Sequence, residues 1–409
     1  MYNKRKIIND PVFGFINIPS ELLFQLIQHP YFQRLGRIKQ LGLASFVYPG
    51  AQHTRFQHSL GTMYLMNETV ATLRAKGNFI SDEEAEGVSA AILLHDVGHG
   101  PFSHVLEYTL VKNIPHEVVS QYMMEVINEE TGGKLDLTLQ IFNDRYPKQF
   151  LHQLVSGQLD MDRLDYLRRD SFFTGVTEGN IGSARIIKML NVKDDKLVVE
   201  AKGIYSIENF LTARRLMYWQ VYLHKTAVAA EKVMVNTLSR AKELASKGTE
   251  LFASPALRYF LYNDITRSDF EKDGEALHHF ALLDDTDIWS ALKVWCNHSD
   301  KVLSILSRCM INRLLFKIEI SPKPFDVHRK QHYISDFAFK LNIPEKDAAY
   351  FVSTDTVSTN MYNPDDDRIG IFFNDGSVKD ISEASDMFNI SLLSKEAKKY
   401  YFCYLREIK

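Results

Sequence analysis

The stretch AILLHDVGHGPFSH, residues 91–104, places an adjacent histidine and aspartate at the end of an apolar segment. Residues 90–94 are apolar and follow SDEE at 81–84, which is a strong helix N-terminus. The glycines and the proline that come next break the helix soon after His95 and Asp96. Neighbouring helical residues project about 100° apart, so both side chains can touch one ion only near the helix end.

More histidines and carboxylates lie in three further stretches: HTRFQHS (53–59), HE (116–117) and DMDRLDY (160–166). An imidazole with a carboxylate suits a divalent metal ion, with Mn²⁺, Fe²⁺, Co²⁺, Ni²⁺, Mg²⁺ or Zn²⁺ as candidates. Two ligands are too few for tight binding, so His58 and Asp162 are expected to complete the set. A lone His-Asp pair is more often a structural pair, and the spacing alone does not decide between the two readings.

The whole chain excludes several classes of protein. It has 409 residues, 45% of them hydrophobic and 24% charged, with a formal net charge of −3, so it lacks the global basic charge typical of nucleic-acid binding. A local basic groove stays open. No secretory signal and no apolar run of roughly 18 residues are present, so no membrane association is expected. The three cysteines are widely spaced, and a reducing cytoplasmic location is the simplest interpretation.

The hydrophobic patterning predicts a mainly α protein with a small α+β region at the C-terminal end. Helices are expected at residues 19–28, 59–75, 81–94, 207–225, 227–246, 252–261, 287–295 and 300–310. Strands are expected at 196–200 and 314–320, and at 368–373 and 377–381 around the hairpin turn Asn374-Asp375-Gly376. We divide the chain into a helical core (1–240), a helical extension (241–312) and a small α+β region (313–409).

Seven blocks carry a resemblance to a known family: IINDPVFGFI (7–16), YFQRLGRIKQLG (31–42), YPGAQHTRFQHSLG (48–61), LLHDVGHGPFSH (93–104), HE (116–117), GQLDMDRLDYLRRDS (157–171) and RRLMYWQVYLHK (214–225). In order and spacing they resemble the HD-domain phosphohydrolase superfamily. Within it, the chain is similar to the deoxynucleoside triphosphate triphosphohydrolases, the branch that includes the vertebrate sterile-alpha-motif/HD-domain dNTPase. The resemblance implies that residues 1–240 form an HD-domain helical core.

The resemblance also implies a role for each matched position. The metal ligands fall on His58, His95, Asp96 and Asp162. The catalytic group falls on His99 and His116, with Glu107 as the carboxylate partner of His116. The substrate-binding positions are Gln40, Arg55, Arg163, Tyr166, Asp170, Arg214, Tyr222 and Lys225.

The implied reaction is hydrolysis of a deoxynucleoside triphosphate to the deoxynucleoside and inorganic triphosphate. The divalent ion would act as a Lewis acid on the α-phosphate. His116 would protonate the leaving 5′-oxygen while Glu107 fixes its tautomer. The arginine and lysine side chains would neutralise the triphosphate. Relatives form dimers or tetramers, so a homo-oligomer is expected.

Two other functions stay open. HD proteins share one metal site across several phosphoester reactions, so a nucleotide phosphomonoesterase or phosphodiesterase is the alternative enzyme. A nucleotide- or single-strand-binding regulatory protein without turnover is the alternative from another class.

Some residues also have simpler interpretations. Arg55 can be the partner of a nearby carboxylate, and Tyr166 and Tyr222 can be core aromatics. Asp165 and Asp170 can be solvated helix residues, and His53 is expected to have a structural role. Gln57 stands where many relatives carry Glu, and Gln28 and Gly36 stand where nucleotide-activated members carry an acidic residue and an arginine. Guanine-nucleotide activation is therefore not expected.

Overall fold

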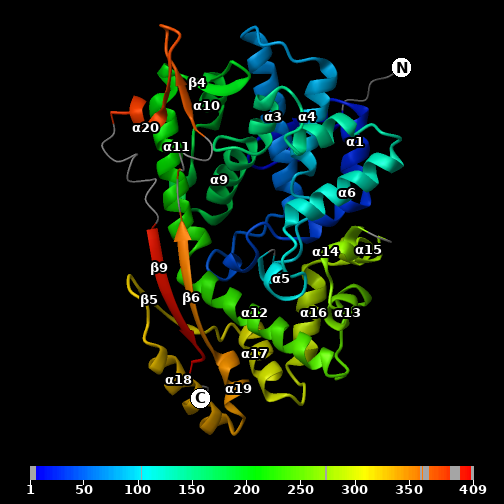
Figure 1. The fold of residues 1–409 in the computed structure, drawn as a ribbon, viewed down its shortest axis with the longest axis vertical. Helices are drawn as coiled ribbons and strands as arrows, with labels where there is room; N and C mark the ends of the chain where they lie inside the picture. The colour runs from blue at the N-terminus through cyan, green and yellow to red at the C-terminus, as the bar shows by residue number, and fades with distance from the viewer. Residues whose placement is uncertain are drawn as a thin grey trace.

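Helices dominate the computed structural model, which describes residues 6–102, 104–271, 274–359, 362, 368–386 and 397–406. Short strands in these residues form three small sheets (Figure 1). The mainly α fold with a small α+β addition is therefore confirmed. No helix within these ranges is both long and apolar enough to cross a membrane.

The first described element is a β-hairpin that was not predicted from the sequence. Its strands β1 (Ile7–Asp10) and β2 (Gly14–Asn17) pair antiparallel. The buried Asp10 carboxylate accepts hydrogen bonds from the backbone N–H groups of Val12 and Phe13, both at 2.9 Å. Bonds of this kind satisfy the donors of a tight turn.

The core helices follow in chain order. They are α1 (Glu21–Gln28), α2 (Pro30–Gln33), α3 (Arg55–Ala75), α4 (Asp82–Leu94), α5 (His104–Thr109), α6 (His116–Glu130), α7 (Asp136–Phe142), α8 (Gln149–Val155), α9 (Met161–Thr174) and α10 (Ser183–Met189). Short 3₁₀ turns are η1 (Arg34–Arg37), η2 (Gly42–Phe46), η3 (Thr177–Gly179) and η4 (Ala201–Gly203). The helices predicted at 19–28, 59–75 and 81–94 are confirmed as α1, α3 and α4, and α3 packs against both α4 and α9.

Side-chain caps set where the helices begin, and so where the histidines lie. Ser81 forms a capping box at the start of α4. At α3 the Gln57 side chain accepts a hydrogen bond from the Thr54 backbone N–H at 2.9 Å. These boundaries place His58 in the first turn of α3 and His95 directly after α4.

The second half of the chain continues as helices. α11 (Ile204–Met217) runs into a π-helical turn, Tyr218–Tyr222, before α12 (Lys225–Ser246), so the helix predicted at 207–225 is interrupted. Single π-turns inside helical segments are frequent at functional sites. The remaining helices are α13 (Pro255–Tyr262), α14 (Arg267–Glu271), α15 (Glu275–Leu282), α16 (Asp285–Trp295), α17 (Lys301–Ile311), α18 (Val327–Leu341), α19 (Glu345–Ala348), η6 (Ala349–Phe351) and α20 (Ile381–Ala384).

Two further sheets contain the C-terminal strands. β3 (Leu190–Lys193) and β4 (Lys196–Glu200) form a hairpin, and β7 (Gly370–Phe372) pairs in parallel with β4, followed by β8 (Val378–Asp380). The other sheet has β9 (Ala397–Tyr404) between β5 (Lys317–Ser321) and β6 (Val352–Thr359). Residues 370–372 thus share a sheet with residues 190–200, while the predicted boundaries at 240 and 312 stay predictions.

The α3 helix contributes to two hydrophobic clusters. Leu60 and Met63 belong to a cluster that extends through α12 to α17, and Leu65 and Met66 belong to one with α9 and α11. A helix packed on several sides has little freedom to move, so side chains at its N-terminal end are held by a rigid element.

Candidate metal centre and active site

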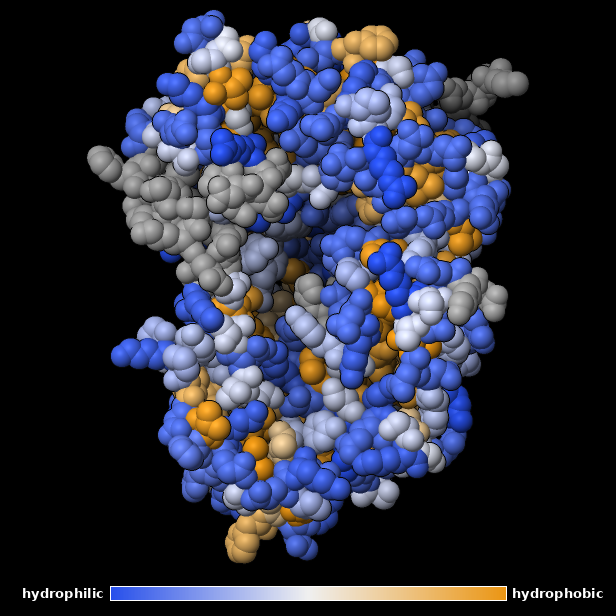
Figure 2. Space-filling model, in the orientation of Figure 1, coloured by the Kyte–Doolittle hydropathy of each residue, from blue (hydrophilic) through white to orange (hydrophobic). Residues whose placement is uncertain are grey.

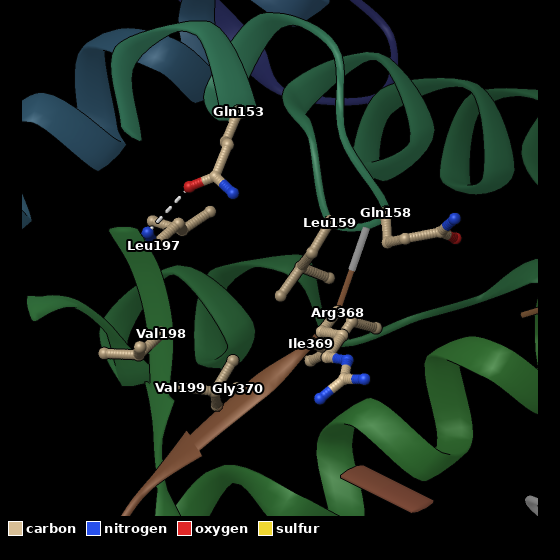
Figure 3. Close-up of a pocket in the computed structure, with 9 residues that line it drawn as sticks. All are labelled: Gln153, Gln158, Leu159, Leu197, Val198, Val199, Arg368, Ile369 and Gly370. Carbon is tan, nitrogen blue, oxygen red and sulfur yellow. Dashed lines mark hydrogen bonds between the residues drawn. The ribbon is translucent and has the colours of Figure 1, made fainter. Parts of the chain in front are cut away.

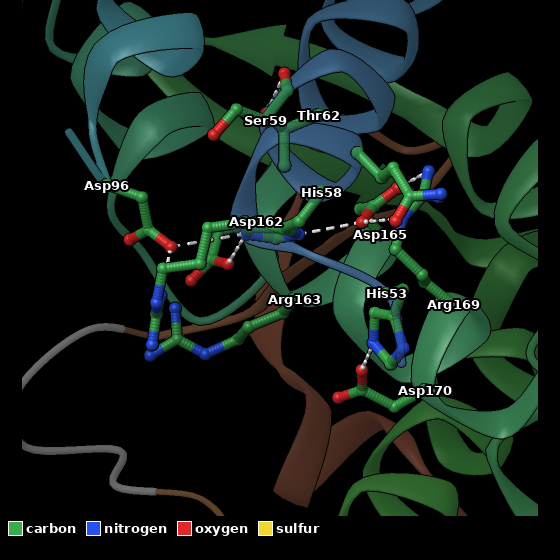
Figure 4. Close-up of polar contacts among 12 residues, drawn as sticks. His53, His58, Ser59, Thr62, Asp96, Asp162, Arg163, Asp165, Arg169 and Asp170 are labelled. Atoms are coloured by element: carbon green, nitrogen blue, oxygen red, sulfur yellow. Dashed lines mark hydrogen bonds and ion pairs between the residues drawn. The ribbon is translucent and has the colours of Figure 1, made fainter. Parts of the chain in front are cut away.

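Four predicted ligand residues meet where the ends of α3, α4 and α9 approach one another. Figure 4 shows three of them, His58, Asp96 and Asp162. Asp162 Oδ1 lies 3.1 Å from His58 Nε2 and 3.6 Å from His95 Nε2. Asp96 reaches the same two rings, with Oδ1 3.3 Å from His95 Nε2 and Oδ2 3.7 Å from His58 Nε2. The set contributes two imidazoles and two carboxylates.

The donor atoms of this set fit a divalent metal ion. The Nε2 atoms of His58 and His95 are buried and make no hydrogen bond, although carboxylate oxygens lie close to them. Their Nδ1 atoms are engaged elsewhere: His58 Nδ1 lies 2.7 Å from Asp165 Oδ2, and His95 Nδ1 lies 2.6 Å from the Ile92 carbonyl oxygen. A neutral ring that donates its Nδ1–H has a free Nε2 lone pair, which is the usual state of a metal-binding histidine.

The electrostatics of the centre favour ionised carboxylates. Burial alone would raise the pKa of Asp162, but its contacts with His58 and His95 lower that pKa well below its usual range. Burial also opposes ionisation of Asp96, yet the nearby charges of His95 and His99 lower the Asp96 pKa as well. Burial would lower the pKa of His58, but the adjacent carboxylates of Asp162 and Asp165 raise it to about 10. Two ionised carboxylates that draw positive charge onto a buried imidazole are suited to bind a cation.

Arg55 is the ionic partner of Asp96, as its simpler interpretation predicted. Its Nη1 atom lies 2.5 Å from Asp96 Oδ2, and its buried Nε atom makes no hydrogen bond. The Asp96 carboxylate is thus shared between a guanidinium group and the histidine rings.

The predicted catalytic histidines form one group beside this centre. The rings of His99 and His116 stack with centroids 3.7 Å apart and planes 19° from parallel. His99 Nε2 lies 3.2 Å from Asp96 Oδ1, and His116 Nδ1 lies 3.2 Å from Glu107 Oε1. Burial and the charge of Arg55 hold the pKa of His99 well below its ordinary value. His116 therefore has a carboxylate near each nitrogen, because the more exposed Glu117 Oε1 lies 3.4 Å from Nε2.

A close backbone approach brings His116 to this position. A Cβ atom on Gly98 would lie 2.2 Å from the Ser120 backbone nitrogen and 2.3 Å from the His116 carbonyl oxygen. Only a residue without a side chain fits there. The Gly98 N–H donates to Ser120 Oγ at 2.9 Å, and that hydroxyl donates to the His95 carbonyl at 2.8 Å. The N-terminal end of α6 is therefore fixed against the segment that carries the two central ligands.

The cationic residues predicted to bind substrate differ in their surroundings. Arg163 contacts Asp160 and the Gly157 carbonyl, and Arg214 Nη1 donates to Gln158 Oε1 at 3.0 Å. Lys225 is exposed at the start of α12. The charges of Arg163 and Arg214 both act on Tyr166, whose pKa is raised well above its ordinary value, mainly by burial.

The polar residues predicted around the sugar are connected by hydrogen bonds. The Tyr222 hydroxyl donates to Asp170 Oδ2 at 2.7 Å, and its ring meets that of Tyr166 edge-on with centroids 5.9 Å apart. Gln40 Oε1 is buried without a hydrogen bond. His53, which was given only a structural role, lies 2.7 Å from Asp170 Oδ1 and holds that carboxylate from the other side (Figure 4).

The interpretation of Asp165 and Asp170 as solvated helix residues is wrong, because both are buried. Asp165 contacts His58 and Arg169, and Asp170 contacts His53 and Tyr222. The usable sequence signal was helical spacing: Asp162, Asp165 and Arg169 lie three and then four residues apart, which puts them on one face of α9.

A small cavity lies beside strands β4 and β7 (Figure 3). It is lined by Gln153, Gln158, Leu159, Leu197, Val198, Val199, Arg368, Ile369 and Gly370. Gln158 is also the hydrogen-bond partner of Arg214, so this cavity adjoins a predicted phosphate contact. The molecular face in Figure 2 is hollowed near its centre, and hydrophilic side chains form the upper rim of the hollow.

Comparisons with known proteins agree with this geometry. The HD domain model matches residues 55–145, and the HD associated region model matches residues 181–254. The crystal structure of a phosphohydrolase from Bacteroides thetaiotaomicron superposes with a TM-score of 0.96 at 66% identity, covering 98% of this chain and 100% of that chain.

Two curated relatives differ in how much of their length is matched. The uncharacterized protein YwfO of Bacillus subtilis is 30% identical over 399 residues, covering 94% of this chain and 88% of YwfO. The deoxynucleoside triphosphate triphosphohydrolase SAMHD1 of Gallus gallus is 30% identical over 282 residues, covering 58% of this chain and 45% of SAMHD1. The chain thus spans about half the length of that triphosphohydrolase.

Proposed function

Because this chain belongs to the HD-domain phosphohydrolases, in the branch that resembles SAMHD1, we propose that it hydrolyses deoxynucleoside triphosphates to deoxynucleoside and inorganic triphosphate. The proposed metal ligands are His58, His95, Asp96 and Asp162. A divalent cation bound there would supply Lewis acidity to a phosphoryl oxygen and to a water molecule. The ion is proposed to be Mn²⁺, Fe²⁺, Co²⁺, Ni²⁺, Mg²⁺ or Zn²⁺.

The observation that carries the proposal is the contact between the ligand set and the stacked histidine pair. Asp96 Oδ1 lies 3.3 Å from His95 Nε2 and 3.2 Å from His99 Nε2. A phosphoryl group held at the ligand set therefore lies next to a histidine pair that can move a proton. Phosphoester cleavage needs both functions in one place.

His116 is proposed to protonate the leaving 5′-oxygen. Glu107 accepts at His116 Nδ1, so the transferable proton resides on Nε2. His99 stacks on the ring and fixes its plane. Burial and the charge of Arg55 lower the pKa of His99, which disfavours a positive charge on this ring.

The triphosphate is proposed to be held by cationic side chains on several elements. Arg55 lies beside Asp96, Arg163 contacts Asp160, and Arg214 donates to Gln158. Guanidinium groups bind phosphate oxygens in pairs and keep their charge at any physiological pH. Lys225 would reach the distal phosphates, and Gln40, Asp170 and Tyr222 would contact the sugar.

Product analysis tests the reaction. Purified protein is incubated with each dNTP and each NTP against a panel of the six metal ions, and the products are separated by anion-exchange chromatography. Deoxynucleoside with inorganic triphosphate is the expected result, and an Asp96→Ala variant is the matched control. Release of orthophosphate would replace the proposal with a phosphomonoesterase, and cleavage of another phosphoester with all four dNTPs left intact would overturn it.

We also propose that the enzyme is a homo-oligomer, on the basis of the family resemblance. Mass photometry at micromolar concentration, with and without nucleotide, is expected to give a dimer or tetramer. A monomer under both conditions contradicts this.

A further inference from the structure

One nitrogen of the ligand His58 faces away from the proposed metal position and begins a chain of buried charges. His58 Nδ1 lies 2.7 Å from Asp165 Oδ2, and both side chains are fully buried. A carboxylate at Nδ1 holds the ring in the tautomer whose Nε2 lone pair is free, and it fixes the plane of the ring.

Asp165 is itself held by Arg169, four residues later on α9. Arg169 Nε donates to Asp165 Oδ2 at 2.8 Å, and Nη2 donates to Oδ1 at 3.0 Å. This paired contact fixes the carboxylate as well as its charge.

The chain of charges ends in the N-terminal hairpin. Arg169 Nη1 donates to Asp10 Oδ2 at 2.7 Å, and the guanidinium group lies 5.6 Å from the centre of the Phe13 ring. Asp10 is fixed in turn by the backbone N–H groups of Val12 and Phe13. The hairpin therefore determines where Arg169 can sit.

Gly61 on α3 gives these groups the space they need. A Cβ atom at this position would lie 2.0 Å from Asp165 Oδ1 and 2.3 Å from Arg169 Nη2. Gly61 lies three residues after His58, so the paired contact crosses the same helix that carries the ligand.

We propose that Asp165, Arg169 and Asp10 form a positioning network that sets the metal affinity of His58 from the N-terminal hairpin. Arg169 is held between the carboxylates of Asp10 and Asp165, so it keeps Asp165 in the position that contacts His58 Nδ1. Losing Asp10 would leave Arg169 with one partner and would draw Asp165 away from the ring. The proposal rests on the metal site of the proposed function, but it does not depend on the substrate.

The alternative is that the network only stabilises the fold. A second buried arginine gives the matched control, because Arg240 Nη1 donates to Asp347 Oδ1 at 2.9 Å in a network that contains none of the proposed metal ligands. Removal of a charge there should weaken folding without changing metal binding.

The test measures Co²⁺ binding to the full chain by absorption titration, with thermal unfolding of the metal-free proteins alongside. Asp165→Asn is expected to weaken Co²⁺ affinity roughly 10- to 100-fold, because partners of ligating histidines contribute by that much. Asp10→Asn keeps the Asp165–Arg169 pair. This variant is expected to weaken Co²⁺ affinity roughly threefold to tenfold. Asp347→Asn should stay within about twofold of the wild type.

Each outcome decides the matter. If Asp165→Asn and Asp10→Asn unfold at lower temperature but bind Co²⁺ within about twofold of wild type, the network is structural and the proposal fails. If Asp165→Asn does not fold, Asp10→Asn carries the same test. Wild-type protein that binds no Co²⁺ overturns the metal site and the network together, whereas intact dNTPs with normal Co²⁺ binding overturn only the substrate.

Discussion

Two buried arginines, Arg169 and Arg240, organise networks of the same chemistry in different halves of the molecule. Arg169 joins Asp10 and Asp165, and its side chain is fully buried. Arg240 joins Glu243, Asp300 and Asp347 in a setting where its side chain is 7% exposed and these partners are 16–30% exposed. The first network ends on a proposed metal ligand, and the second connects α12 to α17 and α19.

The difference in burial indicates whether each network contributes to the stability of the fold or to the geometry of a site. Removing ions from water costs several kcal/mol each, so a fully buried ion network is weak support for a fold. A partly solvated network has a smaller desolvation cost and can therefore add net stability to the fold. We infer that the Arg169 network persists for the geometry of His58 and the Arg240 network for the packing of the helices.

The largest expected effect comes from a metal ligand beside the first network. Asp96→Asn is expected to lower kcat/KM for a dNTP by at least about 1,000-fold, because metal-centred stabilisation of several kcal/mol is lost. Asp300→Asn is the control in the second network, where Asn still caps α17, and it should stay within about twofold. Steady-state kinetics, at a temperature well below the unfolding transitions of both variants, measures these changes in kcat/KM. An Asp96→Asn enzyme with a tenth of wild-type activity would contradict the expected difference between the two variants.

The next effect concerns the space that the first network requires. Gly61→Ala is expected to destabilise the protein by about 3 kcal/mol, because the added methyl overlaps the Asp165–Arg169 pair and the helices must move apart. The matched change Gly87→Ala puts its methyl 3.1 Å from a movable Leu137 side chain and should change stability by about 1 kcal/mol or less. Urea unfolding compares the two, and equal losses would show that the network is not tightly constrained.

A smaller effect tests the second network directly. Arg240→Met is expected to lower the free energy of unfolding by about 2 kcal/mol. The loss is smaller than for a fully buried ion pair, because the carboxylates left without their arginine are partly exposed to solvent. Co²⁺ affinity and turnover at low temperature should be unchanged. A loss of metal binding in this variant would mean that the two networks are coupled.

The smallest effect is a pH dependence. Hydrogen bonds from Lys247, Tyr350 and Arg240 outweigh burial and lower the pKa of Glu243 to about 2. A carboxyl whose pKa is lower in the folded protein than in the unfolded chain stabilises the fold above the unfolded value. That stability is lost as the pH falls from the unfolded pKa of about 4.3 toward 2.

Glu243→Gln should remove this component. Chemical denaturation from pH 7 to pH 2.5 should give a wild-type free energy that falls more steeply with acid than that of the variant. Parallel curves would show that Glu243 does not titrate differently on folding.

Local chemistry made much of the fold predictable. The capping box at Ser81 fixed the start of α4, and the Asn374-Asp375-Gly376 turn predicted the β7–β8 hairpin. The parallel pairing of β4 with β7 was not predictable, because it joins strands separated by several helices and has no local signal. The N-terminal hairpin was missed because its turn depends on hydrogen bonds that the Asp10 carboxylate accepts from the Val12 and Phe13 N–H groups.

The sequence predicted some residues of the candidate site and missed others. The meeting of His58, His95, Asp96 and Asp162 followed from the family resemblance, and the structure brings them together. Asp165 was missed because charged residues on a helix are usually solvated. Its burial depends on Gly61, and a single sequence does not reveal that this glycine faces α9.

The parallel pairing of β4 with β7 also has a consequence for the order of synthesis. A ribosome releases β3 and β4 long before β7, so the nascent chain carries an unsatisfied strand edge next to the segment that bears Gln158. Fragments that end before residue 370 would keep that edge open and would tend to self-associate. The nascent chain should therefore need chaperones until β7 emerges from the ribosome.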